Sequence, residues 1–222
     1  MSIPTNNLYL LMQVNDSSFP IGAYTQSYGL ESYVVYDQIK TKEDALNYIL
    51  TNLKTTMSYT ELLAVSLSFD YTKANQIDNL CKLDKKLLAL KSAKEIRDAS
   101  LKLGSRFAKA ISSMDIAFLK NLNLLNYSVL YGALWSCIGI SKKTALSFYI
   151  YSQTSAMVTN CVKLVPLSQT AGQQILYEIS KEYDNIIDNV FSMNESDLGL
   201  STPALDIRCM QHEILYSRLY MS

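Results

Sequence analysis

Helix-breaking residues are scarce in this chain, and that scarcity constrains the fold more than any other feature. The 222 residues include 7 glycines and 4 prolines, roughly half of what average usage would give. Few breakers leave few tight turns, which favours long helices over many short strands. Apolar residues recur at helical spacing in almost every segment, and no alternating strand pattern of useful length is present. The sequence therefore predicts an all-α bundle of roughly eight to ten helices.

Local signals place several helix ends. Three segments begin with a side chain that commonly caps a helix, namely Thr41, Ser141 and Thr202. Asp44 completes a capping box with the first of them, and Pro203 suits the first position of the last helix. Residues 78–111, rich in strong helix formers, and residues 168–191 are each predicted as one continuous helix. Because no linker-like stretch or internal repeat is present, residues 1–222 are expected to form a single all-helical domain.

The charge balance bears on the partners that the chain can attract. Lysine plus arginine number 20 and aspartate plus glutamate also number 20, so the formal net charge is zero. No basic field is available to hold nucleic acid or an anionic membrane, and no apolar run approaches the roughly 18 residues of a membrane span. The chain begins without the basic segment of a signal peptide. We therefore expect a cytoplasmic protein that binds neither nucleic acid nor membrane.

The composition also points to dependence on another protein. Hydrophobic residues make up 49% of the chain and charged residues 18%, which is slightly more apolar than an average soluble domain. A neutral, apolar surface is poorly protected against association, so we expect a partner to cover part of it. The cysteines are dispersed and are predicted to be buried thiols in a reducing compartment; they are Cys81, Cys137, Cys161 and Cys209.

Residue types that carry chemistry are sparse. His212 is the single histidine, so the sequence offers no cluster of histidine and cysteine ligands for zinc or iron. It also lacks a phosphate-binding loop of the type G-x-x-x-x-G-K-[ST]. Asp184 and Asp188 lie one helical turn apart and are interpreted as a solvated helix face. We expect no cofactor, no metal site and no catalysis, and hence a protein that acts by contact.

Two other functions stay open on this basis. His212 could be a haem ligand or a general base in an all-helical haem-binding protein or enzyme, although a lone helical histidine is more often packed or hydrogen-bonded. A GTPase-activating protein would instead supply an arginine to the active site of its partner. The sequence does not choose among four candidates for that role, which are Arg97, Arg106, Arg208 and Arg218.

Three stretches differ from ordinary helical sequence. They are "DSSFPIGAYTQSYGLE" (16–31), "VKLVPLSQTAGQQ" (162–174) and "STPALDIRCMQHEILYSRLYMS" (201–222). In the first, Pro20 ends a helix and Gly22 permits sharp entry into a second helix, whose Gly29 would allow a neighbour to approach closely. The second stretch joins Lys163 to an uncharged polar cluster, and the third combines an apolar stripe with arginine and tyrosine. Such compositions are typical of protein interfaces.

Together the three stretches resemble the urease accessory protein UreF family. The first stretch matches the family's N-terminal pattern at Asp16, Ser17, Pro20, Gly22, Tyr24, Ser27, Gly29, Leu30 and Glu31. The second matches the pattern K-x-[VI]-P-x-[GS]-Q-x-x-x-Q at Lys163, Pro166, Gln169 and Gln173. The third matches at Pro203, His212, Glu213, Tyr216, Ser217, Arg218, Leu219 and Ser222. Glu95, Arg97 and Gly104 also stand in family positions, whereas the chain departs from the pattern at Asn15, Gln211 and Tyr220.

This resemblance implies an all-α, dimeric protein that takes part in urease maturation, in which nickel is installed in apo-urease. Proteins of this family bind an accessory protein called UreD or UreH. That pair recruits the nickel-carrying GTPase UreG and docks on apo-urease, and UreF serves as a scaffold and a regulator of the GTPase. The expected partners are therefore a UreD/UreH-type protein, UreG, apo-urease through the complex, and a second copy of this chain.

The resemblance also guides two expectations about contact residues. The surface facing the GTPase is expected to include Glu31, Lys163, Gln169 and Gln173. The lysine of this set would pair with an acidic patch or position switch loops of the GTPase. The surface facing the UreD/UreH-type partner is expected to include Arg208, His212, Tyr216, Arg218 and Tyr220.

Overall fold

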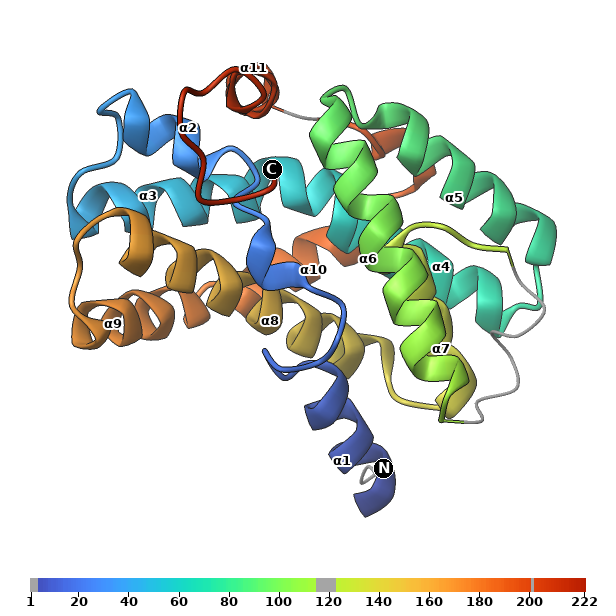
Figure 1. Cartoon of the computed structure of the whole chain (residues 1–222). Helices are drawn as coiled ribbons and strands as arrows, with labels where there is room; N and C mark the ends of the chain where they lie inside the picture. The colour runs from blue at the N-terminus through green and yellow to red at the C-terminus, as the bar shows by residue number, and fades with distance from the viewer. Residues whose placement is uncertain (1–3, 115–122, 201) are drawn as a thin grey trace.

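The computed structural model describes residues 4–114, 123–200 and 202–222; the side chain of Tyr24, part of the N-terminal pattern, lies outside this description. The helices in chain order are α1 (Thr5–Val14), α2 (Leu30–Val35), α3 (Lys42–Asn52), α4 (Leu63–Lys73), α5 (Ile77–Leu90), α6 (Lys94–Ser112), α7 (Tyr127–Ile138), α8 (Lys142–Leu164), α9 (Gln169–Ser180), α10 (Tyr183–Ser192) and α11 (Pro203–His212). The described residues contain no strand. The predicted all-α bundle is therefore confirmed (Figure 1).

Helix α7 forms the centre of the bundle. Every residue from Tyr127 to Trp135 is buried, and α7 packs chiefly against α4 and α6. An apolar sequence around the whole circumference is typical of a helix that other helices surround. Aromatic rings fill the space beside it, and the centroids of Tyr131 and Tyr149 lie 4.9 Å apart in an edge-on arrangement. This core supports the helices that carry the surface features described below.

Helices α3 and α4 belong to one uninterrupted rod, because a π-helical segment (Leu53–Leu62) joins them. The predicted capping box of Thr41 and Asp44 begins the rod. In the π-helical segment, Ser58 Oγ donates to the main-chain oxygen of Leu53, five residues earlier, at 2.6 Å. Because a π-helix has a wider turn than an α-helix, the side chains beyond this segment are rotated relative to a regular continuation of α3.

The π-helical segment also carries Glu61, which forms an ion pair with Lys91 just beyond α5. The lysine side chain is 9% exposed and the glutamate side chain 24%. Burial alone would raise the pKa of the Glu61 carboxyl, but the Lys91 ammonium outweighs this effect, so the pKa is lowered. The pair therefore links the central rod to the start of α6.

Two segments predicted as single helices are each divided in two. Residues 78–111 break after α5, where Arg97 Nη1 donates to the main-chain oxygens of Lys91 at 2.7 Å and Ser92 at 3.0 Å. These contacts satisfy carbonyl groups that the end of a helix leaves free. Residues 168–191 break between α9 and α10, where Glu182 pairs with Lys54 at 2.7 Å. The second break turns α10 toward α8 and the π-helical segment, which allows its apolar stripe to be buried.

The stretch 16–31, here called the corner, is less helical than predicted. After Gly22 the chain makes only a short 3₁₀ turn (Ala23–Thr25), and α2 begins at Leu30. The prediction that a helix starts directly after Gly22 is wrong, because Tyr28 and Gly29 have φ values of 52° and 84°. Such left-handed backbone cannot continue a right-handed helix. The two helices at the corner are thus separated by a loop with main-chain N–H groups available for other contacts.

The ends of the long helices agree better with prediction. Ser141 Oγ accepts from Thr144 N at 3.1 Å and caps α8, and Pro203 is the first residue of α11. Thr202 precedes it but does not cap the helix, because its hydroxyl group bonds to Thr56 Oγ1 at 2.9 Å. None of the described helices combines the length and the apolar character needed to cross a bilayer.

Candidate functional site

The last ten residues, here called the tail (213–222), return along the surface of the bundle. They follow α11 without regular secondary structure. Figure 1 shows α11 at the top of the view and the tail descending between α2 and α6 toward the corner. The tail thus joins the first and the last of the three stretches that the sequence singled out.

Four ionisable side chains, here called the clasp, hold the start of the tail: Glu31, Glu95, His212 and Arg218. The His212 ring lies between the two carboxylates, with Nδ1 2.6 Å from Glu95 Oε2 and Nε2 3.0 Å from Glu31 Oε2. Arg218 Nη1 donates to Glu95 Oε1 at 2.7 Å. The ring is 0% exposed and the Glu31 carboxylate side chain 4%. The clasp therefore connects α2, α6, α11 and the tail through charge-assisted hydrogen bonds.

Main-chain groups of the tail complete this attachment. Glu31 Oε1 accepts from Leu219 N at 2.7 Å, and Glu31 Oε2 accepts from Tyr220 N at 3.1 Å. Met221 N donates to the main-chain oxygen of Thr25 at 2.8 Å. The polar backbone of residues 219–221 is thus bonded to one buried carboxylate and to the corner.

The loop of the corner receives the final residue. Ser27 N and Tyr28 N donate to the main-chain oxygen of Ser222 at 2.5 and 3.1 Å, and Ser222 Oγ bonds to Gln26 Oε1. The left-handed backbone that interrupts the helix at Tyr28 therefore aims two N–H groups at the tail. Asn160 of α8 supports this loop from below, since its Nδ2 donates to the main-chain oxygen of Gln26 at 2.8 Å.

Close packing at Gly29 sets the position of α11. A Cβ atom at this residue would lie 2.9 Å from Cys209 Sγ and 3.4 Å from Cys209 N, so a larger side chain would push α11 away. The predicted close approach of a neighbour at Gly29 is confirmed, although the residue precedes α2 rather than lying within it. Burial raises the pKa of the Cys209 thiol to about 12, which keeps it in the neutral form.

The residues expected to face a UreD/UreH-type partner divide by exposure. Tyr216 is fully exposed and the Arg218 side chain is 40% exposed. Arg208 is half-buried: its guanidinium lies over the Tyr36 ring at 4.8 Å. His212 and Tyr220 are buried, so they hold α11 and the tail in place and present little surface of their own.

The residues expected to face a GTPase divide in the same way. Lys163, in the last turn of α8, is exposed, as are Gln169 and Gln173 in the first turns of α9. These three lie around the α8–α9 corner. Glu31 differs, because it is 3% exposed and its oxygens already accept from His212 and the tail. The structure thus groups Glu31 with the clasp rather than with the lysine.

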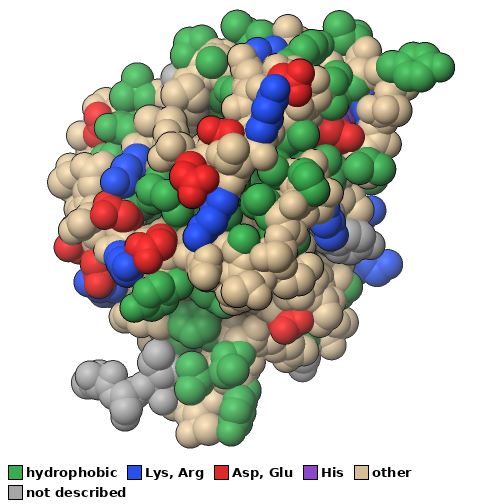
Figure 2. Space-filling model, turned by 90° about the vertical axis from the view of Figure 1, so that its left-hand side faces the viewer, with side chains coloured by type: hydrophobic (Ala, Val, Ile, Leu, Met, Phe, Trp, Pro, Cys, Tyr) green, Lys and Arg blue, Asp and Glu red, His purple; other side chains and the backbone are tan. Residues whose placement is uncertain are grey.

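The densest group of exposed large apolar side chains along the described chain lies on α11 and the tail. Here called the tail face, it comprises Ile207, Met210, Ile214, Tyr216, Leu219 and Met221. Exposed apolar groups concentrated in one segment are typical of protein-binding surfaces. By contrast, the side of the molecule seen in Figure 2 shows acidic and basic side chains interspersed, with no large area of one sign.

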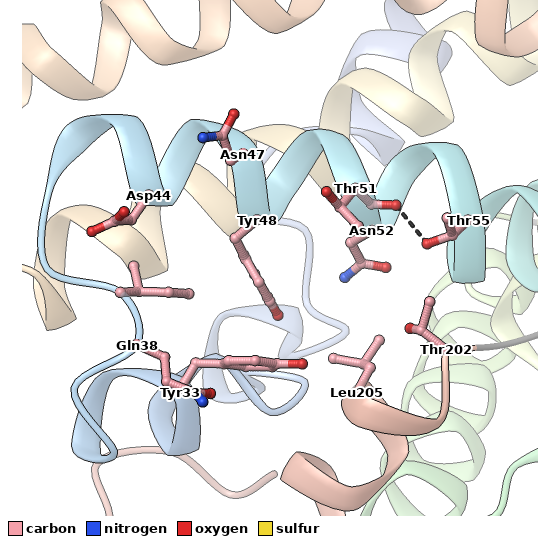
Figure 3. Close-up of a pocket in the computed structure, with 11 residues that line it drawn as sticks. Tyr33, Gln38, Asp44, Asn47, Tyr48, Thr51, Asn52, Thr55, Thr202 and Leu205 are labelled. Atoms are coloured by element: carbon pink, nitrogen blue, oxygen red, sulfur yellow. Dashed lines mark hydrogen bonds between the residues drawn. The ribbon is translucent and has the colours of Figure 1, made fainter.

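An open groove of about 550 Å³ lies beside α11. Figure 3 shows Tyr48, Asn52 and Thr55 along one wall, with Tyr33 and Leu205 opposite them. The lining is mostly hydroxyl and amide groups, and Asp44, which contributes to it, is already engaged in the capping box. The groove therefore contains no converging set of charged groups that would hold an ionic ligand.

The described residues provide little for catalysis or metal binding. Their His, Cys, Asp and Glu side chains form no group of three that could hold a metal ion. In the clasp, the two carboxylates face opposite nitrogens of one ring, so the three groups cannot converge on a single point. Because both His212 nitrogens are occupied and the ring is buried, neither is available to haem iron or a substrate.

The thiols and arginines are equally committed. Burial raises the pKa of the Cys161 thiol to about 12, which makes it a poor nucleophile. The prediction that all four cysteines are buried is wrong for Cys137, which is exposed, and Cys81 is half-buried. The four arginines considered for a GTPase-activating role each contact a group of this chain; they are Arg97, Arg106, Arg208 and Arg218.

Comparison with known proteins identifies the family. The UreF family model matches residues 39–180. The chain belongs to the UreF family. The urease accessory protein UreF of Haemophilus influenzae strain PittGG is 33% identical over 225 aligned positions, covering 97% of this chain and 96% of that protein. The corresponding protein of Actinobacillus pleuropneumoniae serotype 5b is 33% identical, covering 96% and 97%. That of Geobacillus kaustophilus is 30% identical, covering 97% and 98%.

The UreF motifs contain most of the clasp, but they do not show that its members meet. Glu31 lies 181 residues from His212, and Glu95 lies 117 residues from it. Asp84 was missed altogether, although a signal existed: it is a charged residue within the buried stripe of α5, beside Leu83 and Leu87. A charged residue on an apolar helix face indicates a buried polar partner, and Asn126 is that partner.

Proposed function

We propose that this UreF-family chain is a urease maturation factor that works as a non-catalytic scaffold. It binds a UreD/UreH-type protein, and it recruits and regulates the GTPase UreG for insertion of nickel into apo-urease. Family membership over nearly the full chain supports this role. The single structural observation that carries the proposal is the tail face, a concentration of exposed apolar side chains on a protein with few free reactive groups.

The tail face is the proposed site for the UreD/UreH-type partner. Tyrosine and arginine are frequent anchors of binding energy in protein interfaces. Tyr216 is fully exposed, and Arg218 and Arg208 stand beside the apolar side chains on the tail and α11. His212 and Tyr220 support this surface from beneath, since they are buried.

The α8–α9 corner is the proposed site for the GTPase. Lys163, Gln169 and Gln173 are exposed there, and no ion pair occupies the lysine among the described contacts. A free lysine beside neutral amides suits an acidic patch on a partner, and its main effect would be on the rate of association. Glu31 would act on this surface indirectly, through the corner and the tail that it holds. The scaffold is proposed to act as a homodimer and to reach apo-urease through the complex.

Co-purification from cells that also express UreD- and UreG-type proteins of the same organism tests the proposal. The tagged chain is expected to recover a defined complex with both, and size-exclusion chromatography with light scattering reports its stoichiometry. Ile214→Asp with Leu219→Asp should abolish capture of the UreD-type protein by placing charge in the tail face. Tyr177→Asp is the matched control, because Tyr177 is equally exposed on α9, outside the tail face.

A second pair of variants separates the two surfaces. Lys163→Ala is expected to retain the UreD-type protein but to weaken recovery of the GTPase, whereas Lys102→Ala, another exposed lysine, should change neither. Unchanged melting temperatures would show that all variants are folded. A wild-type chain that recovers neither partner would overturn the scaffold proposal.

A further inference from the structure

The protonation state of the clasp follows from its hydrogen bonds. A neutral imidazole has one N–H group and one lone pair, whereas the charged form donates from both nitrogens. Here both ring nitrogens face carboxylate oxygens, at 2.6 and 3.0 Å. A neutral ring would direct its lone pair at one of these oxygens in a site that water does not reach, because the ring is 0% exposed.

The charges around the ring lead to the same conclusion. Glu31 faces it from α2, Glu95 from α6, and Arg218 extends from the tail to Glu95. Two carboxylates are balanced by one guanidinium only if the imidazole also carries a positive charge. Cys209 of α11 and Tyr220 of the tail add none, because burial raises the pKa of each side chain and keeps it neutral. An unbalanced buried charge is strongly unfavourable.

The tail depends on these same carboxylates. Leu219 N, Tyr220 N and Arg218 all donate to Glu31 or Glu95. Apolar burial adds little, because Tyr220 is the single large side chain of the tail that is fully buried. A change that displaces either carboxylate would therefore remove much of what holds the tail.

We propose that His212 is a proton-dependent lock for the tail: the doubly protonated ring holds residues 213–222 on the corner, and loss of one ring proton to solvent releases them. The bond that breaks is one ring N–H, and the electron pair stays on the nitrogen. The docked state then binds one proton more than the released state. Docking should therefore weaken as the pH rises above about 6.5, where imidazole in water becomes neutral, by at most about tenfold per pH unit.

The single histidine permits a direct measurement on the full chain. Labelling with ¹⁵N-histidine gives NMR signals of this one ring, and backbone amide signals of Leu219 and Tyr220 report whether the tail is docked. Between about pH 6 and about pH 9, we expect the ring to change from the doubly protonated to the neutral form while those amide signals shift together. A neutral ring with a docked tail, or release without a change in the ring, would refute the lock.

One variant distinguishes the lock from a merely structural histidine. In Glu95→Gln, the side-chain amide can donate to Nδ1, so a neutral ring satisfies both neighbours and the charges still balance. This variant should keep the tail docked and lose the pH dependence. Glu213→Gln is the matched control, because that exposed carboxylate follows the histidine in sequence and should leave the pH profile unchanged. Persistent pH-dependent release in Glu95→Gln would contradict the proposal. No partner protein enters these measurements, so their outcome is independent of the scaffold role.

Discussion

Asp84 is the residue whose removal should disturb this fold most clearly. Its carboxylate is buried in the structure, with the residue 2% exposed. It accepts from Leu125 N at 3.0 Å, Asn126 N at 2.9 Å and Asn126 Nδ2 at 3.0 Å. Ser100 Oγ completes the network by donating to Asn126 Oδ1 at 3.0 Å. These bonds attach the entry of the central helix α7 to α5 and α6.

The cost of Asp84→Ala can be worked from these contacts. Asn126 is 0% exposed, so its main-chain and side-chain donors would both lose a carboxylate oxygen without access to water. An orphaned buried donor costs about 1–3 kcal/mol, which gives about 2–6 kcal/mol for the pair. Leu125 is exposed, and its N–H can bond to water at little cost. Since whole domains are stable by about 5–15 kcal/mol, the variant should be severely destabilised.

Urea unfolding followed by far-ultraviolet circular dichroism measures this loss. Asp84→Asn should lose about half as much, because its amide oxygen retains one acceptor. Asp98→Ala, an exposed carboxylate on α6, serves as the control and should stay within about 0.5 kcal/mol of the wild type. If Asp84→Ala cost less than about 1 kcal/mol, water or a rearranged loop would be replacing the carboxylate, and the accounting of orphaned donors would be wrong.

Three other perturbations test separate parts of the structure. Gly104→Ala would place a Cβ atom 1.9 Å from the main-chain oxygen of Leu125, so it should lower the free energy of unfolding by at least about 2 kcal/mol, measured by thermal unfolding. Glu61→Gln should cost about 1.5–3 kcal/mol at neutral pH. Because the folded pKa of Glu61 is lowered, the wild type gains this stability above the ordinary carboxyl pKa of about 4.3 and loses it as the pH falls through the lowered value. The variant should therefore show a flatter acid limb in denaturation measured against pH; an unchanged limb would show that the ion pair contributes nothing. Alkylation followed by mass spectrometry should modify the exposed Cys137 first, whereas Cys161 should react only after unfolding, and early modification of Cys161 would contradict its burial.

The all-helical class and the principal helix starts are written in the sequence itself. Capping chemistry acts over three or four residues, so Thr41 with Asp44 and Ser141 could be recognised without a structure. The order and spacing of the UreF motifs likewise identify the family from one chain. The breaks after α5 and α9 were not recognisable, because each is stabilised by a side chain that satisfies or pairs with the break from another element or turn.

The candidate site shows where sequence reasoning ends. The motifs placed Glu31 beside Lys163 on one surface and His212 on another, because a pattern of residues does not show which side chains are buried. The tertiary structure instead brings Glu31 and His212 together with Glu95, which lies 117 residues from the histidine.

What the sequence alone determined is therefore local or statistical: helical periodicity, caps, the lack of metal-ligand clusters and the family motifs. What only the tertiary structure decided is the set of contacts between distant segments, including the clasp, the bond from Asp84 to Asn126 and the seat of the tail on the corner. The physical reason is that helix signals arise from neighbours along the chain. The protonation and exposure of a side chain arise instead from whichever groups packing places around it.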